Sequence, residues 1–345
     1  MECIVMKFGG TSICNNEKRL AAFKHIKREL EAGYKVVVVV SAMGRMGESY
    51  ATDTLKELVS SQLSKQENDR LLACGEIISS IVMSDFLRQQ GVRAIALSPH
   101  DIGIKTDDTY SNANVQAVDV SLIKAAFDEY DVVIAPGFVG TTQTHNIATL
   151  GRGGSDTTAV VLGAQLQATY VEIYSDVAGV MTADPKLVKD AKVLDEISYE
   201  MLVLLAARGA KVIHSKAIEY AKQQDVKLRL RQTTTEAVGT NVVHQAIKTL
   251  SLTSKPNYVR YGIVQNISFS TPIPLIKHGA YWYTEQSNVK DIEAYLNKVG
   301  IEFLKKDSFV RISVIEQQVN LVETTYFVES SRLEETMCFL HNNLV

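Results

Sequence analysis

Hydrophobic residues in the first two thirds of the chain form short unbroken runs that alternate with longer amphipathic segments. The runs predict strands at 3–8, 35–40, 92–97, 132–136, 170–174 and 226–230. The run at 35–40 holds five consecutive valines, which is typical of a parallel strand buried on both faces. The intervening segments predict helices from Asn15 or Asn16 to Gly33 and at 71–87, 115–129, 199–207 and 217–223, and another that follows the loop around Arg152 and ends at about 167. This alternation predicts an α/β domain, doubly wound or sandwiched, around a mainly parallel sheet.

The pattern changes after the polar run 232–239, which we interpret as a linker. Short strands are expected at 263–269, 280–283, 309–315 and 325–328, and helices at 289–298 and 333–340. We therefore divide the chain into a catalytic domain at 1–240 and a small α+β module at 241–345. Because the module has little glycine-rich loop chemistry, we expect it to regulate or to dimerise.

Composition narrows the class of protein further. The chain has 345 residues, is 46% hydrophobic and carries a net charge of -3, so nothing draws it to nucleic acid or an anionic membrane. Its four cysteines lack CxxC pairing and are expected to be reduced thiols in a cytoplasmic protein. No signal peptide and no apolar run long enough to span a bilayer is recognised. The seven scattered histidines predict no metal site built from the protein.

One glycine-rich loop, at 151–158, runs directly into the apolar residues 159–162, which suggest the helix that ends at about 167. Adjacent glycines let backbone amides approach a ligand closely, and a helix N-terminus favours anions. Ser155 or Asp156 is expected to cap the helix, and Arg152 adds a fork suited to a carboxylate or phosphate. Taken alone, the loop is equally compatible with an ordinary cap beside a surface arginine.

A second glycine turn follows the first predicted strand, in the order Lys7-Phe8-Gly9-Gly10. The Walker and Rossmann glycine signatures are absent from this position. A lysine placed before the glycines can reach a transferring phosphoryl group while the amides bind the rest of the phosphates. The alternative is a surface lysine beside a tight turn. The segment 41–44 ends the next strand, where open α/β sheets place ligands.

Glu76 lies in the predicted helix at 71–87, which is apolar nearly all round. A carboxylate in such a helix is costly unless a cation or hydrogen-bond donors meet it. We favour a ligand cation over the alternative, an internal ion pair.

Several blocks of the sequence occur together in one order. They are Lys7 to Ser12, 41–44, Thr52-Asp53, 74–76, 151–156, 175–185 and 209–214. In this order the chain resembles an aspartokinase of the amino-acid-kinase superfamily, most of all the monofunctional bacterial form sensitive to diaminopimelate. The resemblance covers about the first two thirds of the chain and implies the amino-acid-kinase sandwich fold.

The resemblance implies that ATP phosphorylates the side-chain carboxylate of L-aspartate to give 4-phospho-L-aspartate. This reaction opens the biosynthesis of lysine and diaminopimelate, threonine and methionine. The nucleophile is already ionised at neutral pH, so no general base is needed and positioning with charge neutralisation suffices. Mg²⁺ is expected to be held chiefly by the ATP phosphates and water.

The resemblance also implies a role for each matching residue. Lys7 and Asp156 are expected to be catalytic, the first stabilising phosphates and the second orienting groups near the transferred one. Aspartate is expected to contact Ser41, Thr52, Glu76, Arg152 and Ser155, with Glu76 on its ammonium and Arg152 on its α-carboxylate. The nucleotide is expected to contact Lys7, Phe8, Gly9, Gly10, Ser175, Asp176, Met181, Asp184 and Lys211. Asp184-Pro185 equally suits the start of a turn.

Two features depart from the family pattern. Ser215-Lys216 stands where the family usually has Pro-Arg, which predicts weaker ATP binding. About a hundred residues follow the linker, enough for one ACT-like module where the family carries two. We therefore expect weak or absent inhibition by lysine or diaminopimelate. A homodimer formed through the C-terminal module is a further expectation from the family.

Two other functions compete with this interpretation. One is a kinase for another acidic metabolite such as acetylglutamate, whose acylated amine would not need Glu76. The other is a non-catalytic subunit that binds amino acids, although a decayed site should first lose Lys7, Arg152 or Asp156.

Overall fold

A computed structural model describes residues 2–210, 212–245, 249–263, 273–279, 281–298, 303–317 and 321–344. They form two compact units. The first consists of Met1–Val180, Val193–Ala206 and Lys211–Gln245, and the second of Met181–Lys192, Ala207–Ala210 and Ala246–Val345. Two short segments from within the first 240 residues therefore belong to the second unit. The assignment of catalytic and regulatory roles to 1–240 and 241–345 stays a prediction.

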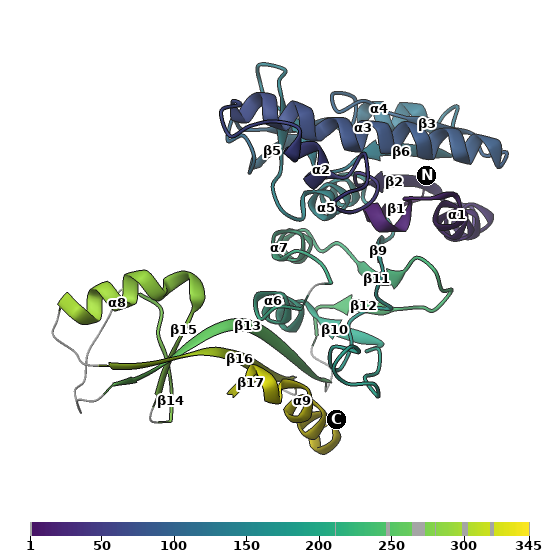
Figure 1. The fold of residues 1–345 in the computed structure, drawn as a ribbon. Helices are drawn as coiled ribbons and strands as arrows, with labels where there is room; N and C mark the ends of the chain where they lie inside the picture. Colours follow the sequence, from purple (N-terminus) through teal and green to yellow (C-terminus); the bar gives the residue numbers. More distant parts are fainter. Residues whose placement is uncertain are drawn as a thin grey trace. The chain divides into compact units, whose positions relative to one another are not determined.

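An eight-stranded sheet forms the centre of the first unit (Figure 1). Its order is β10 (Glu196–Ser198), β12 (Thr240–Val243), β11 (Leu228–Gln232), β9 (Val171–Ser175), β1 (Cys3–Phe8), β2 (Lys35–Val40), β6 (Val132–Pro136) and β3 (Ala94–Ala96). Every pairing is parallel except that of β11 with β12, which confirms the predicted mainly parallel sheet. The chain leaves β1 for β2 on one side and returns to β9 on the other. Strand order thus reverses at β1, where α/β sheets bind ligands.

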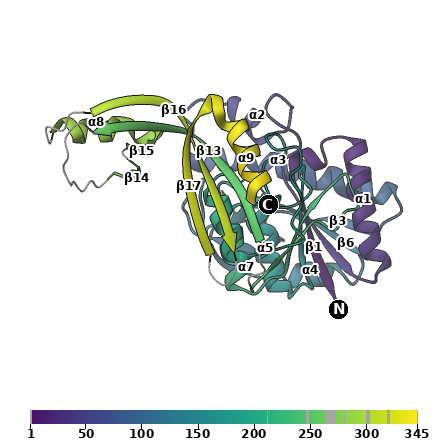
Figure 2. The same cartoon turned by 90° about the horizontal axis from the view of Figure 1, so that it is seen from below.

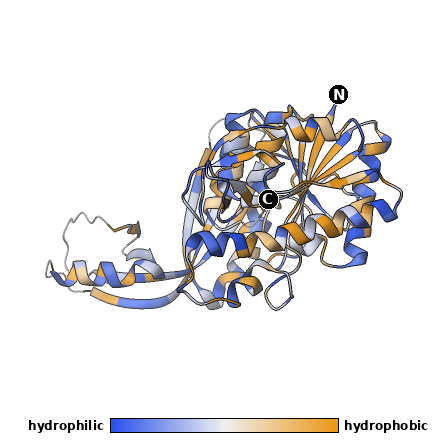
Figure 3. Ribbon diagram, turned by 90° about the horizontal axis from the view of Figure 1, so that it is seen from above, coloured by the Kyte–Doolittle hydropathy of each residue, from blue (hydrophilic) through white to orange (hydrophobic). Residues whose placement is uncertain are grey.

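Helices cover both faces of this sheet. The helices of the first unit are α1 (Asn16–Glu31), α2 (Thr52–Glu57), α3 (Lys65–Gln89), α4 (Ser121–Ala126), α5 (Gly154–Leu166), α6 (Tyr199–Ala207) and α7 (Ser215–Gln223), with a 3-10 turn η1 (Gly10–Ser12). Met6 on β1 packs in one cluster with Ile26 of α1 and Met83 of α3. Gly163 of α5 lies against Val5 and Val171 instead. Since successive side chains of a strand point to opposite faces, α1 and α3 cover one face and α5 the other. Figure 3 shows the apolar strands between them.

A second, four-stranded sheet lies in the first unit, in the order β5 (Val115–Val118), β4 (Ile104–Thr106), β7 (Val139–Thr141) and β8 (Ile147–Thr149). The predicted helix at 115–129 is wrong in its first part, because Val115–Val118 pairs antiparallel with β4. The helix starts only at Ser121, whose N–H donates to Asp119 Oδ1 at 2.9 Å.

The polar run 232–239 is a turn inside the eight-stranded sheet rather than a linker. It joins β11 to β12, and these strands pair from Leu228 with Val242 to Leu230 with Thr240. Gly239 adopts a φ of +76°, which glycine tolerates better than other residues.

The described residues of the second unit form a five-stranded antiparallel sheet with two α-helices, as predicted for a small α+β module (Figure 2). The order is β14 (Ile276–His278), β15 (Tyr281–Glu285), β13 (Thr249–Ile263), β16 (Phe303–Gln317) and β17 (Leu321–Glu329). Helix α8 (Val289–Lys298) packs on Val259 and Tyr261, whereas α9 (Leu333–Leu344) packs on Leu252 and Ile312. The long strand β13 therefore contributes to a separate apolar cluster with each helix, and Tyr258 of the same strand belongs to a third cluster with Tyr283 and Phe309. The predicted strand at 263–269 lies, after its first residue, outside the described residues.

A buried network of charged and phenolic groups joins α1 to β9 and β11 in the first unit. Glu172 on β9 is fully buried and accepts from Arg231 at 2.8 Å and from the Tyr174 hydroxyl at 2.6 Å. Arg28 of α1 lies 3.4 Å from the same carboxylate. Burial, followed by the charge of Glu172, raises the pKa of the Tyr174 hydroxyl, so this phenol stays protonated as a donor.

Glu172→Gln should lower the free energy of unfolding by about 3–5 kcal/mol, because it leaves the buried guanidinium of Arg231 without its counter-charge. Urea unfolding measures the change. The matched control is Glu31→Gln, which removes an exposed carboxylate 3.6 Å from Lys27 and should cost less than about 1 kcal/mol. Equal losses in the two variants would contradict a stabilising role for the network.

Candidate active site

The carboxyl end of β1 brings the two predicted catalytic residues together. Lys7 alternates with Phe8 along the strand, so its side chain lies on the face that α5 covers. Lys7 Nζ lies 2.7 Å from Asp156 Oδ1 in the first turn of α5, and the two side chains are only 12% and 11% exposed. The paired lysine can offer positive charge at a fixed point beside the glycine turn that follows.

The first glycine turn is pressed against the segment after β2. Gly44 N–H donates to Gly10 O at 3.1 Å, and Ser41 N–H donates to Phe8 O at 3.2 Å. A Cβ on Gly10 would lie 2.1 Å from Ala42 O, so only glycine fits. This close approach holds the turn beside the half-buried Ser41.

The second glycine loop leads into the N-terminus of α5. Gly153 is the N-cap at φ +70°, and no side chain caps the helix, so the predicted cap by Ser155 or Asp156 is wrong. A Cβ on Gly153 would lie 2.1 Å from the Cβ of His214, which leaves no room for another residue. The backbone N–H of His214 in turn donates to Asp156 Oδ2 at 3.4 Å. The helix end thus keeps the amide-rich character that binds anions.

Two predicted substrate residues flank this helix end. Arg152 is exposed and forms no ion pair within the part of the chain that the structure describes. Ser155 is 8% exposed, and a Cβ on Gly137 would lie 2.8 Å from its hydroxyl oxygen. Gly137 follows β6 and donates its N–H to Val40 O at 2.8 Å, so Ser155 lies near the ends of β2 and β6.

Glu76 of α3 approaches from the opposite face of the sheet. It is 2% exposed, and its Oε1 accepts from Ala42 N–H at 3.1 Å. Its Oε2 has no hydrogen-bond partner among the described residues, and these include no cation paired with it. Burial raises the pKa of the Glu76 carboxyl to about 8, against the smaller lowering effect of the Ala42 N–H. The internal ion pair that competed with a ligand role is therefore not found in the described structure.

Within the described structure, the side chains of four other predicted site residues form no hydrogen bond or ion pair with Lys7, Glu76 or Arg152. Thr52 is half-buried and begins α2. Phe8 is fully buried and stacks on Tyr174 with 4.7 Å between the ring centroids, so only its backbone is left to meet a nucleotide. Ser175 ends β9, and the exposed Asp176 after it lies 2.8 Å from the Arg45 guanidinium.

Three nucleotide residues of the prediction lie outside this group. Met181 and Asp184 belong to the second unit. Asp184 Oδ1 accepts from Lys186 N–H at 2.9 Å, as expected of a residue that starts a turn. Lys211 lies outside the described residues.

The sequence patterns did not indicate Asp69 as a site residue, although it is a fully buried carboxylate on α3. The predicted helix at 71–87 leaves Asp69 out. In the structure this helix begins at Lys65, so Asp69 lies seven residues before Glu76 on the same side of one helix. The sequence patterns also missed Thr158, whose hydroxyl accepts from Phe138 N–H at 3.1 Å. Lys216, noted as a departure from the family, donates to Asn112 Oδ1 at 2.6 Å.

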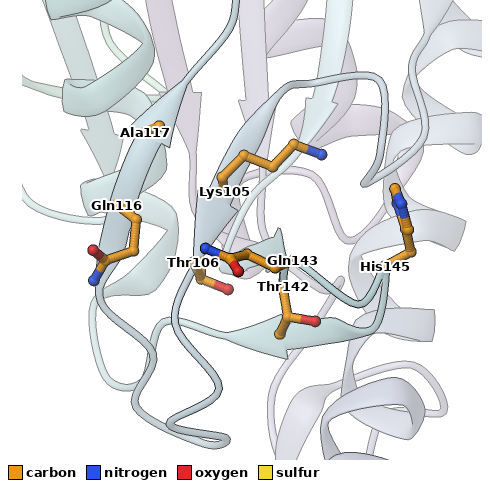
Figure 4. A pocket seen from close by; sticks show the side chains of 7 residues that line it. All are labelled: Lys105, Thr106, Gln116, Ala117, Thr142, Gln143 and His145. Atoms are coloured by element: carbon orange, nitrogen blue, oxygen red, sulfur yellow. The ribbon is translucent and has the colours of Figure 1, made fainter.

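A hollow of about 350 Å³ lies by the four-stranded sheet (Figure 4). It is lined by Lys105, Thr106, Gln116, Ala117, Thr142, Gln143 and His145, none of which is a predicted site residue. It is therefore separate from the group around Lys7.

The described residues contain no group of three or more His, Cys, Asp or Glu side chains arranged to hold a metal ion. None of their helices is both long and apolar enough to cross a membrane.

Comparison with known proteins defines the class to which this geometry belongs. Residues 2–232 match the amino acid kinase family. Aspartokinase III of E. coli, solved in complex with aspartate and ADP, superposes with a TM-score of 0.72 at 20% identity over 99% of this chain and 100% of that one. The likeness confirms the amino-acid-kinase fold together with an ACT-like second unit.

Relatives in sequence show which members of the amino acid kinase family this chain resembles. An aspartokinase of Geobacillus stearothermophilus is 36% identical over 336 residues, which cover 97% of this chain and 77% of that protein. Aspartokinase 1 of Bacillus subtilis is 45% identical over 245 residues, or 70% of this chain, and this match spans 61% of the relative. The chain thus aligns with less than two thirds of the latter's length. It belongs to the amino acid kinase family and, within it, to the aspartokinases.

Glu76→Gln should change how stability depends on pH. A carboxyl whose pKa rises from 4.5 in the unfolded chain to about 8 contributes stability below pH 4.5 and loses it as pH climbs through 8. Because the glutamine cannot ionise, the free energy of unfolding of the variant should rise relative to that of the wild type by roughly 1 kcal/mol per pH unit between pH 5 and 8. Urea unfolding across this range measures the difference. Asp85→Asn, an exposed change on the same helix, should show no such trend, and a pH-independent difference for Glu76→Gln would contradict the assignment.

Proposed function

We propose that this protein transfers the γ-phosphoryl group of ATP to the side-chain carboxylate of L-aspartate, giving 4-phospho-L-aspartate and ADP. The observation that carries the proposal is the pairing of Lys7 and a glycine turn at the end of β1 with a buried carboxylate, Glu76, that has an unused oxygen. The first group suits a phosphate and the second an ammonium. L-Aspartate and ATP supply these two groups.

On the phosphoryl side, the chain contributes charge and fixed dipoles. Lys7 acts as a point charge on the transferring group, and the amides of Gly9 and Gly10 and of the α5 N-terminus meet the other oxygens. Asp156 holds the lysine in place at 2.7 Å and is not a proton acceptor, because the attacking carboxylate is already ionised. Mg²⁺, held by the ATP phosphates and water, would supply further positive charge there.

On the aspartate side, two groups of opposite sign recognise the zwitterion. Glu76 Oε2 accepts from the ammonium, and the Arg152 guanidinium binds the α-carboxylate. Ser41, Thr52 and Ser155 supply hydroxyl groups to the bound substrate. Both reacting groups are thereby held in line, so that positioning provides most of the rate acceleration.

The remaining parts of the proposal concern the nucleotide and the assembly. Ser175 and Asp176 contact the nucleotide. The protein acts in the cytoplasm at the start of lysine and diaminopimelate biosynthesis, and it forms a homodimer through residues 241–345. The ACT-like fold of this part, a five-stranded antiparallel sheet with α8 and α9, supports a dimerising or regulatory role.

Two observations favour this function over its competitors. A kinase for an acylated amino acid has no ammonium to place against Glu76, whose Oε2 would then stay buried and unpaired. A non-catalytic binding subunit has no use for a lysine held next to a glycine turn. Phosphorylation of acetylglutamate would identify the first competitor, and absence of ATP turnover would identify the second.

Lys7→Ala should lower kcat about 10²–10³-fold, as expected when one donor to the developing charge is removed. The KM for aspartate should change much less, since Lys7 meets the phosphates. Trapping the acyl phosphate with hydroxylamine measures both constants. Lys24→Ala, an exposed change on α1, should leave them unchanged, whereas full activity in Lys7→Ala would overturn the proposal.

Aspartate binding at pH 7 should release up to one proton. With a pKa of about 8, Glu76 is mostly protonated before binding, and a bound ammonium favours its ionised form. Isothermal titration in two buffers of different ionisation enthalpy counts the protons. Glu76→Gln should bind aspartate weakly and release none, and a buffer-independent heat for the wild type would argue against an ammonium at Glu76.

A further inference from the structure

Asp69 is a buried carboxylate that satisfies its charge entirely with hydrogen-bond donors. It is fully buried on α3, where Oδ2 accepts from Ser111 N–H at 2.8 Å and from Thr149 N–H at 2.7 Å. Its Oδ1 accepts from the Ser111 hydroxyl at 3.1 Å. The described residues place no cation against it. Three donors from two distant chain segments therefore converge on this one side chain.

The same helix holds Glu76 two turns further on. Residues seven apart lie on the same side of an α-helix, about 10 Å apart along its axis. Asp69 is bonded to the end of β8, whereas Glu76 is bonded to Ala42 after β2. Helix α3 thus connects two segments that each lead to a substrate-binding group.

The segment bound by Asp69 leads directly to Arg152. Thr149 ends β8, and Arg152 follows three residues later. Leu150 N–H donates to Phe138 O at 2.8 Å, which holds the chain just past Thr149. The position of Arg152 is therefore set close to a point that Asp69 fixes.

Ser111 connects Asp69 with the glycine loop from a second side. It adopts a φ of +70°, an unusual conformation for serine, and both its N–H and its hydroxyl bond to Asp69. Its neighbour Asn112 lies against Gly151, where a Cβ would come within 2.6 Å of Asn112 Oδ1. Lys216 Nζ donates a hydrogen bond to the same amide oxygen at 2.6 Å. The loop at 111–113 therefore supports the start of the Arg152 loop.

We propose that Asp69 is a positioning residue that sets the spacing between the ammonium site at Glu76 and the α-carboxylate site at Arg152. It makes the site selective for a substrate that carries both groups on one carbon. This inference rests on the proposed function. Its mechanism is hydrogen bonding, not charge, because the carboxylate meets only N–H and O–H donors.

Two variants of Asp69 separate positioning from charge. Asp69→Asn keeps an acceptor oxygen for the two N–H groups, and its amide can donate to the Ser111 hydroxyl oxygen, so the loops stay in place. Asp69→Leu keeps the branched arrangement of four side-chain heavy atoms, with two bulkier methyl groups in place of the oxygens, and accepts no hydrogen bond. The two ligands to compare are L-aspartate and 3-aminopropanoate, which retains the ammonium and the reacting carboxylate but lacks the α-carboxylate.

Dissociation constants of both ligands, measured by isothermal titration in the presence of MgADP, test the proposal. Asp69→Leu should raise the dissociation constant of L-aspartate about tenfold and change that of 3-aminopropanoate less than twofold. Asp69→Asn should bind both ligands as tightly as the wild type does. Met83→Ala, a fully buried change further along α3, should lower the urea midpoint without changing the ratio of the two constants. If Asp69→Leu does not fold, Ser111→Gly tests the proposal instead, because it keeps the N–H bond to Asp69 and loses the hydroxyl bond. Its dissociation constant for L-aspartate should rise about threefold.

The outcomes distinguish the inference from the function on which it rests. A wild type that binds L-aspartate no better than 3-aminopropanoate overturns both. A wild type that prefers L-aspartate, with the preference unchanged in Asp69→Leu or, failing that, in Ser111→Gly, overturns the role of Asp69 alone. Parallel loss of both ligands in Asp69→Leu also overturns it, because a merely structural residue would act in that way.

Discussion

The first unit depends on the alternation of side chains at the end of β1. This strand lies between β2 and β9, where the strand order reverses, and it is parallel to both. Phe8 points into the apolar layer below α1 and α3 and stacks on Tyr174, which anchors the strand end. Lys7 must then point to the other face, toward α5. A shift of one residue in register would place Phe8 at the site in place of the half-buried Lys7.

Both covering layers contribute a charged group to the same strand end. Helix α5 brings Asp156 to Lys7, and α3 brings Glu76 to Ala42. Glycines at 10, 137 and 153 permit these approaches, because a Cβ at any of them would lie within 2.8 Å of a neighbouring atom. Charge is thus placed by rigid elements, as a reaction driven by positioning and electrostatics requires.

Much of this arrangement could be predicted from sequence patterns. Continuous apolar runs predicted the parallel strands, and the glycine turns with Lys7, Asp156 and Glu76 predicted charged groups near their ends. Local propensity failed at Val115–Val118, where pairing with β4 outweighs a helical pattern. It also failed at Gly153, because a left-handed backbone, rather than a serine or aspartate side chain, begins α5. Asp69 was missed because its partners, Ser111 and Thr149, are 42 and 80 residues away in sequence.

A crystal structure of the protein with L-aspartate and a non-hydrolysable ATP analogue tests the central claim most directly. The account predicts the substrate ammonium at Glu76 Oε2, the α-carboxylate at Arg152, and the terminal phosphate between Lys7 and the Gly9–Gly10 turn. Aspartate bound elsewhere, such as in the hollow beside Thr106, would contradict it. So would a terminal phosphate that makes no contact with Lys7.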